Sequence, residues 1–422
     1  MSPVGREWRR EPLYHLDPEL NELLRCELIR QQETLELIAS ENFASRAVLE
    51  ATGSVLTNKY AEGLPGARFY GGCEIVDQVE QLAIDRCKAV FGAEHVNVQP
   101  HSGSSANLAA LFAMLEPGDT LMGMELAHGG HLTHGLGINY SGRTYDVVPY
   151  HVRRDTETID YDELRELALE RRPKLIICGY SSYPRTVDWA AFRVIADECG
   201  ALLLADIAHI AGLIAAGVHP NPVPYCDIVT STTHKTLTGP RAGLIMCRRE
   251  HARAIDRAVF PGMQGGPLMH VVAAKAVCLK IAQSEPFHRL QRQIVANCVV
   301  LAETLADGGV RLVSGGTDVH LALLDLRSTG LNGLQCQDLL DSVGITANRN
   351  VVPFEEGSFN VASGLRVGSP AVTTRGFMEP EMRHTGELML RALAARGNDA
   401  ALAEIHSEVL DLLERFPLYE FL

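Results

Sequence analysis

The chain has 422 residues, of which 46% are hydrophobic and 21% are charged, as is typical of soluble globular proteins. Its net charge of -14 argues against a general nucleic-acid-binding protein, because a phosphate backbone requires a basic surface. No run of about 18 apolar residues occurs, so we expect neither a transmembrane helix nor a membrane partner. The polar N-terminus carries arginines without an apolar segment after them, so we expect no signal peptide.

The 10 cysteines are scattered along the chain. The closest two, Cys73 and Cys87, are too far apart in sequence to form a metal knuckle or a redox pair. Most of the cysteines lie in apolar segments, which predicts buried free thiols. This usage fits a reducing compartment, and we expect a cytoplasmic protein.

Residues 1–30 predict an N-terminal arm. Asp17 is placed to cap a helix that begins at Pro18. Leucines at helical spacing mark one apolar face of this helix: Leu20, Leu23, Leu24 and Leu28. Such an arm either wraps around a partner subunit or packs as a simple helix.

Residues 31–290 alternate short apolar runs with helical segments. This alternation predicts a large α/β domain whose mixed, mostly parallel sheet is covered by helices on both faces. The expected strands are residues 96–98, 120–122, 175–178, 201–205 and 228–232, and expected helices are 161–170 and 190–199. Ligands bind at the carboxyl ends of the strands in such sheets, so the functional residues should converge there.

Residues 291–422 predict a smaller C-terminal α/β domain, since a chain of this length favours two domains. A long helix that carries Leu290, Ile294 and Leu301 on one face leads out of the large domain. The expected strands then lie near residues 320–326, 344–347 and 364–368, and the expected helices near 379–394 and 399–415.

The stretch from residue 226 to residue 241 contains the most informative lysine. The β-branched run 228–232 predicts a strand, after which come His234 and Lys235 and a turn at Gly239. A lysine at a strand end, surrounded by hydroxyl groups and beside an imidazole, is well placed to form a Schiff base. Burial would favour its neutral, nucleophilic amine. The alternative is a solvated surface lysine in a polar turn.

Residues 230–241 (TSTTHKTLTGPR) resemble the cofactor-lysine signature of the serine hydroxymethyltransferase family. The resemblance runs from about Leu37 to the C-terminus and rests on at least six separate segments. It implies a fold-type I transferase that depends on pyridoxal 5'-phosphate. It also implies that Lys235 holds the cofactor covalently and that His234 shapes the site.

Asp206 ends the apolar run 201–205, and His209 follows it. A buried carboxylate needs a cationic partner, and a pyridinium nitrogen is one such partner. An aspartate that caps the next helix is the alternative. The segment 206–212 (DIAHIAG) again resembles the family, which implies that Asp206 binds the pyridine nitrogen. The resemblance also assigns His209 to cofactor and substrate and Ser181 to the cofactor.

A short glycine- and serine-rich loop, residues 101–107, follows the strand at 96–98 and precedes a helix. Backbone N–H groups at the start of such a helix can bind a phosphate, although a plain helix cap has the same composition. The resemblance assigns Gly103 and Ser104 to the cofactor phosphate. The family has glutamine where this chain has Ser105.

Three imidazoles recur at a spacing of three residues, at His128, His131 and His134. This is the best argument for a metal site in the sequence, but no carboxylate or thiolate accompanies the histidines and two glycines interrupt helical geometry. The family resemblance implies instead that His131 stacks on the cofactor ring. We therefore expect no metal.

The loop 59–72 is punctuated by glycines and carries two tyrosines and a carboxylate, as functional loops often do. A surface loop whose tyrosines pack on a neighbour is the alternative. The loop resembles that of the family, which implies that Glu62 is the acid/base group. It also implies that Tyr60 and Tyr70 reach cofactor and substrate across the interface of a homodimer, or of a dimer of dimers. Two glycines are likewise assigned to the partner's phosphate: Gly265 and Gly266.

Arg366 lies in an apolar strand, residues 364–368. A buried arginine requires an anionic partner, which is either the α-carboxylate of an amino acid or a carboxylate of the protein itself. The resemblance implies that Arg366 binds the substrate carboxylate, with help from Ser40.

Six residues correspond to the family's folate-binding positions: Leu126, Gly130, Leu132, Asn348, Ser358 and Phe359. The chain departs from the family near this site, at Asn360 and at Leu136-Gly137. These departures concern the acceptor of the one-carbon unit and the exact amino acid, and they leave the chemistry at the lysine intact.

We therefore expect the reversible conversion of serine and tetrahydrofolate to glycine and 5,10-methylenetetrahydrofolate. Alternatives within the same cofactor class are an aldolase or transaldolase, or a hydroxymethyltransferase that acts on α-methylserine. A metal-dependent hydrolase built on the three histidines and a non-catalytic protein with the same fold are alternatives of other classes.

Overall fold

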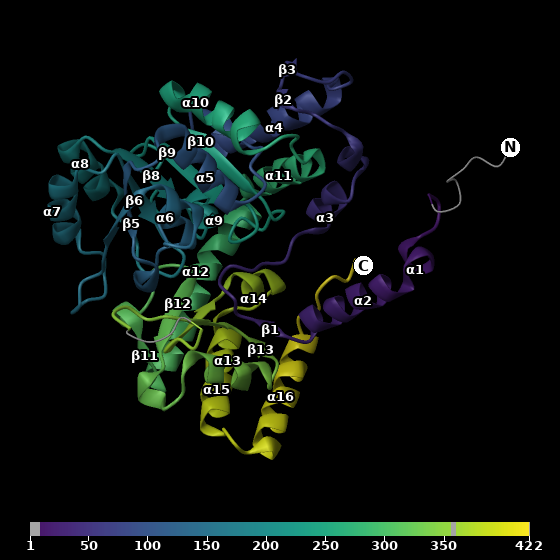
Figure 1. Ribbon diagram of the computed structural model, residues 1–422. Helices are drawn as coiled ribbons and strands as arrows, with labels where there is room; N and C mark the ends of the chain where they lie inside the picture. The colour runs from purple at the N-terminus through teal and green to yellow at the C-terminus, as the bar shows by residue number, and fades with distance from the viewer. Residues whose placement is uncertain (1–8, 356–359, 422) are drawn as a thin grey trace.

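The computed structural model describes residues 9–355 and 360–421. In Figure 1 these residues form two bodies that are joined by one long helix, α12 (Glu285–Asp307). The upper body is built around a seven-stranded sheet, and the lower body around a four-stranded sheet. The chain thus has the α/β architecture that its alternating pattern predicts.

The seven-stranded sheet has the order β4-β10-β9-β8-β7-β5-β6. Adjacent strands from β9 to β6 are parallel, and β10 is antiparallel to both of its neighbours, so the expected mixed, mostly parallel sheet is confirmed. The five expected strands are confirmed as well. The strands are β4 (His95–Asn97), β5 (Thr120–Met124), β6 (Asp146–Tyr150), β7 (Leu175–Gly179), β8 (Leu202–Asp206), β9 (Ile228–Thr232) and β10 (Gly243–Cys247).

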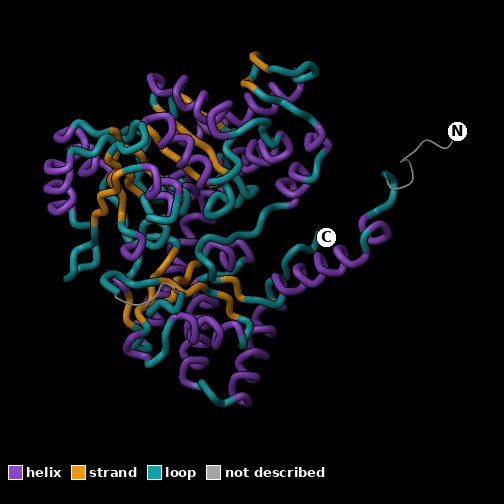
Figure 2. Tube along the Cα trace, viewed as in Figure 1, coloured by secondary structure: helices purple, strands orange, loops and turns teal. Residues whose placement is uncertain are grey.

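Helices cover both faces of this sheet (Figure 2). Side chains alternate between the faces with a period of two. Ile176 and Cys178 of β7 therefore enter one apolar core, and Leu175 and Ile177 enter the other. The helices of this body are α3 (Arg46–Thr52), α4 (Glu74–Phe91), α5 (Gly103–Met114), α6 (Tyr140–Thr144), α7 (Tyr161–Arg171), α8 (Trp189–Cys199), α9 (Ala211–Ala215), α10 (Ala252–Arg257) and α11 (Met269–Ala282).

The lower body combines helices with a sheet of order β11-β12-β15-β14. The strands and helices near residues 320–422 that the sequence predicts are confirmed. Their bounds are β11 (Arg311–Leu312), β12 (Leu321–Asp325), β13 (Ile345–Thr346), β14 (Asn348–Asn350), β15 (Gly364–Gly368), α13 (Gly333–Asp341), α14 (Pro370–Arg375), α15 (Glu379–Ala394) and α16 (Asp399–Glu414).

The division of the chain into residues 1–30, 31–290 and 291–422 stays a prediction, and the packing bears on both of its boundaries. Strand β1 (Leu35–Glu36) pairs in parallel with β13, and Leu35 lies in the core of the lower body. Helix α12 begins before residue 291 and contributes Ile294 to the upper core and Leu301 to the lower one. We therefore propose that β1 is counted with the smaller domain.

The N-terminal arm consists of α1 (Leu13–Leu16) and α2 (Pro18–Gln32), neither of which buries a residue. Asp17 caps α2 as expected, since its carboxylate accepts a hydrogen bond from Leu20 N at 2.9 Å. Figure 1 shows the arm extending away from both bodies, and Leu23 and Leu24 expose 61% and 55% of their surface. Within the described residues, none of the helices combines the length and apolar composition that a membrane span requires.

Candidate functional site

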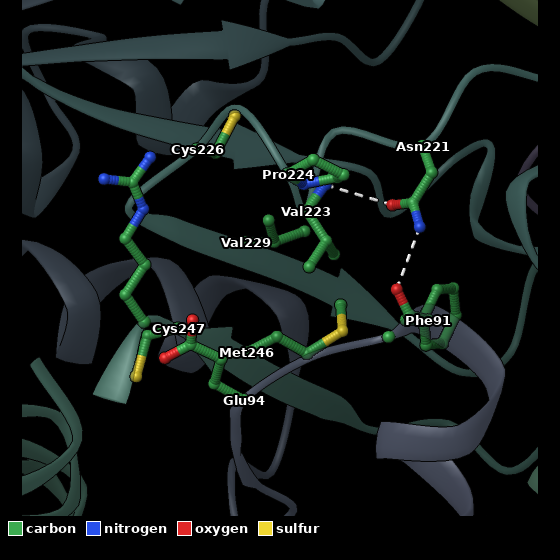
Figure 3. Close-up of a pocket in the computed structure, with 11 residues that line it drawn as sticks. Phe91, Glu94, Asn221, Val223, Pro224, Cys226, Val229, Met246 and Cys247 are labelled. Atoms are coloured by element: carbon green, nitrogen blue, oxygen red, sulfur yellow. Dashed lines mark hydrogen bonds between the residues drawn. The ribbon is translucent and has the colours of Figure 1, made fainter. Parts of the chain in front are cut away.

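A cavity of about 380 Å³ lies at the carboxyl ends of β8 and β9, where the parallel sheet is expected to bind ligands. Ten of the residues singled out in the sequence line it: Ser40, Gly103, Ser104, His131, Ser181, Asp206, His209, His234, Lys235 and Arg366. A second hollow of about 420 Å³, shown in Figure 3, lies where β9 begins and β10 ends, near Cys226 and Cys247. None of the sequence-predicted site residues lines that second hollow.

Asp206 ends β8 and is buried. Its carboxylate accepts hydrogen bonds from Asn107 Nδ2 at 2.8 Å and from Ala208 N at 3.0 Å, and it contacts His134 Nε2 at 3.0 Å. Burial raises the pKa of Asp206, but the hydrogen bond and charge of His134 outweigh burial and hold that pKa below its ordinary value. The carboxylate therefore stays charged at the cavity wall.

The three histidines of residues 128–134 do not converge. His131 and His134 lie with Asp206 in one group whose ligand atoms are within 4.8 Å of one another. His128 instead accepts a hydrogen bond from Val152 N at 3.2 Å. The inference that no carboxylate accompanies these histidines is thus wrong, because β8 delivers Asp206 from a distant part of the chain. The group could hold a metal ion, and the expected absence of a metal stays a prediction.

Lys235 follows β9 and lines the cavity, so it is not the solvated surface lysine of the alternative reading. Burial lowers the pKa of Lys235 to about 8, Asp206 opposes this effect, and Arg366 adds to it. Within the described residues, no hydrogen bond or ion pair occupies the Lys235 amine. Its neighbour His234 contacts Arg241 at 3.3 Å, and burial lowers the pKa of His234 to about 3.

The first turn of α5 faces the same cavity through Gly103 and Ser104. Ser102 and Ser105 cap this helix reciprocally, with Ser105 N donating to Ser102 Oγ at 3.1 Å and Ser102 N donating to Ser105 Oγ at 2.9 Å. Ser105, which stands where the family has glutamine, thus completes the cap. A side chain at Gly103 would meet Thr232 Cγ2 at 2.6 Å, so only glycine fits beside β9.

Arg366 reaches the cavity from β15 of the smaller body. It donates to Ser181 O at 2.8 Å, to Asn348 Oδ1 at 3.1 Å and to Ser40 Oγ at 3.4 Å. In residues 9–355 and 360–421, no carboxylate lies within ion-pair distance of Arg366. The alternative of an internal salt bridge is therefore absent from the described chain, and the guanidinium remains a cation for an anionic ligand.

The loop of residues 59–72 lies outside the cavity that holds Lys235. Glu62 and Tyr60 lie against Gly265 and Gly266, where an added Cβ would be 3.0 Å from Glu62 Oε1 and 3.2 Å from Tyr60 Cε1. The ring centroid of Tyr60 is 4.9 Å from that of Tyr70, and both tyrosines are exposed. None of these five residues lines the cavity that holds Lys235. One chain therefore presents the predicted site in two separate parts.

A family model described as serine hydroxymethyltransferase matches residues 13–389. The chain belongs to the serine hydroxymethyltransferase family. Members of this family are fold-type I pyridoxal-phosphate enzymes that act on amino-acid and folate substrates. The family resemblance and the fold class that the sequence indicated are both confirmed.

The cavity fits the family's cofactor. It offers an unoccupied amine at Lys235, a charged carboxylate at Asp206 and the N-terminus of a 12-residue helix for a phosphate. His131 also lines the cavity, and its ring is fixed by a 2.7 Å contact between Nδ1 and Thr133 Oγ1. Burial, followed by the neighbouring His134, lowers the pKa of His131 to about 4, so this ring is neutral.

The positions that the sequence matched to folate binding differ from one another in their surroundings. Gly130 has a purely local reason to be glycine, because an added side chain would clash with the Met124 carbonyl. Asn348 accepts a hydrogen bond from Arg366, and Leu132 is 41% exposed. Leu126 begins a short 3-10 helix. Ser358 and Phe359 lie outside the described residues.

Three contributors to the site carried no signal in the sequence. Asn107 binds the carboxylate of Asp206, and His320 contacts His209 Nδ1 at 3.2 Å. Lys275 is buried and donates to the carbonyls of Pro100 and Gly243, at 3.0 Å and 2.7 Å, which fixes the loop in front of α5. Each acts on a residue that is distant in sequence, and only the fold brings the two together.

Lys235 of the cofactor-free protein should react with an aldehyde at a rate that rises with pH and levels off above about pH 8. The neutral amine is the nucleophile, and burial lowers the pKa of Lys235 from 10.5 to about 8. Stopped-flow absorbance during uptake of pyridoxal phosphate measures this rate.

The Asp206→Asn variant tests the sign of the effect. Because the charge of Asp206 raises the pKa of Lys235, its loss should move the midpoint of the pH–rate curve to lower pH. A wild-type midpoint at the ordinary lysine value would contradict the burial of the amine.

Proposed function

We propose that the protein transfers the hydroxymethyl carbon of serine to tetrahydrofolate, reversibly, to give glycine and 5,10-methylenetetrahydrofolate. This proposal rests on one observation: Lys235, Asp206 and Arg366 line the same cavity, and no carboxylate of the described residues pairs with Arg366. Membership of the family supports the same reaction type.

Pyridoxal phosphate, when bound, supplies an electron-withdrawing ring that stabilises negative charge on the α carbon of an amino acid. Lys235 would hold its aldehyde carbon, and the helix N-terminus at Gly103 and Ser104 would hold its phosphate. Asp206 remains charged and would keep a proton on the pyridine nitrogen. His131 would lie on the face of the ring, and Ser181 and His209 line the wall of the same cavity.

Arg366 would bind the carboxylate of the amino acid. Its guanidinium is held by Ser181 O and Asn348 Oδ1, and Ser40 Oγ lies at its open side. A bidentate contact fixes the orientation of the carboxylate and thereby selects which bond of the α carbon stands perpendicular to the cofactor ring. The protein therefore chooses the reacting bond through the position of a single cation.

The acid/base group, Glu62, would come from a second copy of the chain. Glu62, Tyr60 and Tyr70 lie outside the cavity of their own chain, on an exposed loop. The unpartnered leucines of α2 offer an apolar surface for the same second copy. We therefore propose a homodimer, alone or as half of a tetramer, with shared active sites. Nine of the ten cysteines are buried and all are free, which supports the proposed cytoplasmic location.

Conversion of serine to glycine should require tetrahydrofolate. Purified protein loaded with pyridoxal phosphate is incubated with serine, with and without tetrahydrofolate, and glycine formation is measured. Serine turnover that ignores folate would point instead to an aldolase or to a hydroxymethyltransferase for α-methylserine. Metal analysis of the same preparation tests the hydrolase alternative.

Arg366→Ala should weaken glycine binding by about 10- to 100-fold while cofactor absorbance is retained, because a charged hydrogen-bonded pair contributes about 1.5–3 kcal/mol. Arg366→Lys keeps the charge but loses the planar guanidinium, so the glycine affinity of this variant should lie between those of the wild type and Arg366→Ala. Calorimetric titration with glycine measures both effects.

Arg349→Ala is the matched control for this series. Arg349 lies on the neighbouring strand, bonds to Gln337 and does not line the cavity. Glycine affinity retained in Arg366→Ala would refute the assignment of the carboxylate site.

Mixed dimers should reveal a shared site. Lys235→Ala and Glu62→Gln chains should each be inactive alone. A dimer of one chain of each kind should regain about half of the wild-type rate, because one of its two sites then contains both native residues. Dimers purified through two different affinity tags allow this measurement. A mixed dimer without activity would place Glu62 and Lys235 of one chain in the same site.

A further inference from the structure

Two buried histidines meet behind the cavity. His209 follows β8 in the upper body, and His320 directly precedes β12 in the lower body. His209 Nδ1 lies 3.2 Å from His320 Nε2, and the rings are nearly parallel, with 27° between their planes. His209 and His320 expose only 3% and 0% of their surfaces. His209 thus has one nitrogen bound to His320, and it also lines the ligand cavity.

Both rings are neutral. Burial lowers the pKa of His320 to about 3, and Arg366 and Lys235 add to this effect. Burial and the same two cations also hold the pKa of His209 well below its ordinary value. A neutral imidazole carries one N–H group and one bare nitrogen. In the contact between the two rings, one histidine must therefore donate and the other must accept.

The surroundings of His320 decide which ring donates. His320 Nδ1 is buried and has no hydrogen-bond partner in the described part of the chain. If His209 donated, His320 would have to carry its proton on Nδ1, as a buried side-chain N–H group without an acceptor, which is rare in folded proteins. If His320 donates through Nε2, only a lone pair is left without a partner, and this costs less.

We propose that His320 is a positioning residue that fixes His209 as the tautomer with its proton on Nε2. His209 Nε2 lies 3.5 Å from Ser181 Oγ, on the cavity side of the ring. The tautomer therefore turns His209 into a hydrogen-bond donor toward the ligand. Together with Arg366 and Lys235, it completes a cavity wall of donors that suits an anionic oxygen.

The anionic oxygen belongs either to the carboxylate of the amino acid or to the phenolate of the cofactor. This assignment alone depends on the proposed function, whereas the tautomer is a property of the protein by itself. Solid-state ¹⁵N NMR of histidine-labelled protein distinguishes the two sources. The His209 Nε2 signal should move on cofactor loading if the phenolate is the acceptor, and on addition of glycine if the carboxylate is.

The same spectra test the tautomer directly. His209→Asn and His320→Gln spectra assign the two rings by difference. We expect a protonated Nε2 and a bare Nδ1 on both rings of the wild-type protein. A protonated Nδ1 on His209 would overturn the proposal, whether or not the protein converts serine. The tautomer is read from the wild-type signals, and each variant is needed only to assign its own ring, so His209→Asn still assigns the His209 signals if His320→Gln fails to fold.

Substitution gives a second readout. His320→Leu removes the donor and should weaken, by about 10-fold, binding of the ligand that the spectra identify as the acceptor, glycine or pyridoxal phosphate. His320→Gln keeps an N–H donor, so binding of that ligand should stay within about 3-fold of wild type. His251→Leu is the control. His251 Nε2 is also buried and has no hydrogen-bond partner within the described residues, although it lies 3.6 Å from the Glu250 carboxylate, and His251 does not line the cavity. Equal losses in the leucine and glutamine variants of His320 would overturn the donor role.

Discussion

The charge of Asp206 at the end of β8 is the constraint on which the cavity depends. A buried carboxylate is costly unless it is paired and hydrogen-bonded. Here Asn107 from α5 and His134 from the segment after β5 contact this carboxylate at hydrogen-bond distance. Lys235 interacts with it electrostatically. The segments that carry Asn107, His134 and Lys235 therefore meet around a single negative charge at the end of β8. The same charge limits how far burial lowers the pKa of Lys235, which stays at about 8.

Around this carboxylate the cavity is rich in cationic and neutral donors. Burial lowers the pKa of His131, His209 and His234, and Lys235 adds to this effect at all three. Arg366 adds to it at His131 and His209, and Arg241 at His234, so these rings are neutral. Neutral rings can stack on a planar cofactor and can donate one hydrogen bond without adding charge. In the proposed reaction the site would separate two tasks: Arg366 and Lys235 would bind anionic groups, and the neutral imidazoles would fix the geometry of the ligands.

The sequence was sufficient for the parts of the fold that depend on local patterns. Strand β9 and the position of Lys235 directly after it follow from a β-branched run and a Gly-Pro turn. Contacts between distant segments could not be predicted in the same way. Asp206 and His134 are 72 positions apart, and no spacing rule connects them. The pairing of β1 with β13 could not be predicted either, because a strand of two residues has too short a sequence pattern to indicate its partner.

The two parts of the predicted site share one buried polar network, and this bears on how they act together. Arg68 donates to Glu80 at 2.6 Å and to Gly63 O at 2.7 Å, beside Glu62. Gln99 then links Glu80, at 2.8 Å, to the end of β4.

From Gln99, the chain leads through Pro100 to the loop before α5, where Lys275 holds the backbone. A shift of the Glu62 loop would break the hydrogen bonds that Gly63 O accepts from Arg68 and Gln99, and the loop before α5 follows Gln99 directly. Because buried polar networks tolerate few arrangements, this network holds the Glu62 loop in a fixed relation to the first turn of α5 in the same chain. Such a relation suits the proposed two-chain site, in which the Glu62 loop of one chain would meet the Lys235 cavity of the other.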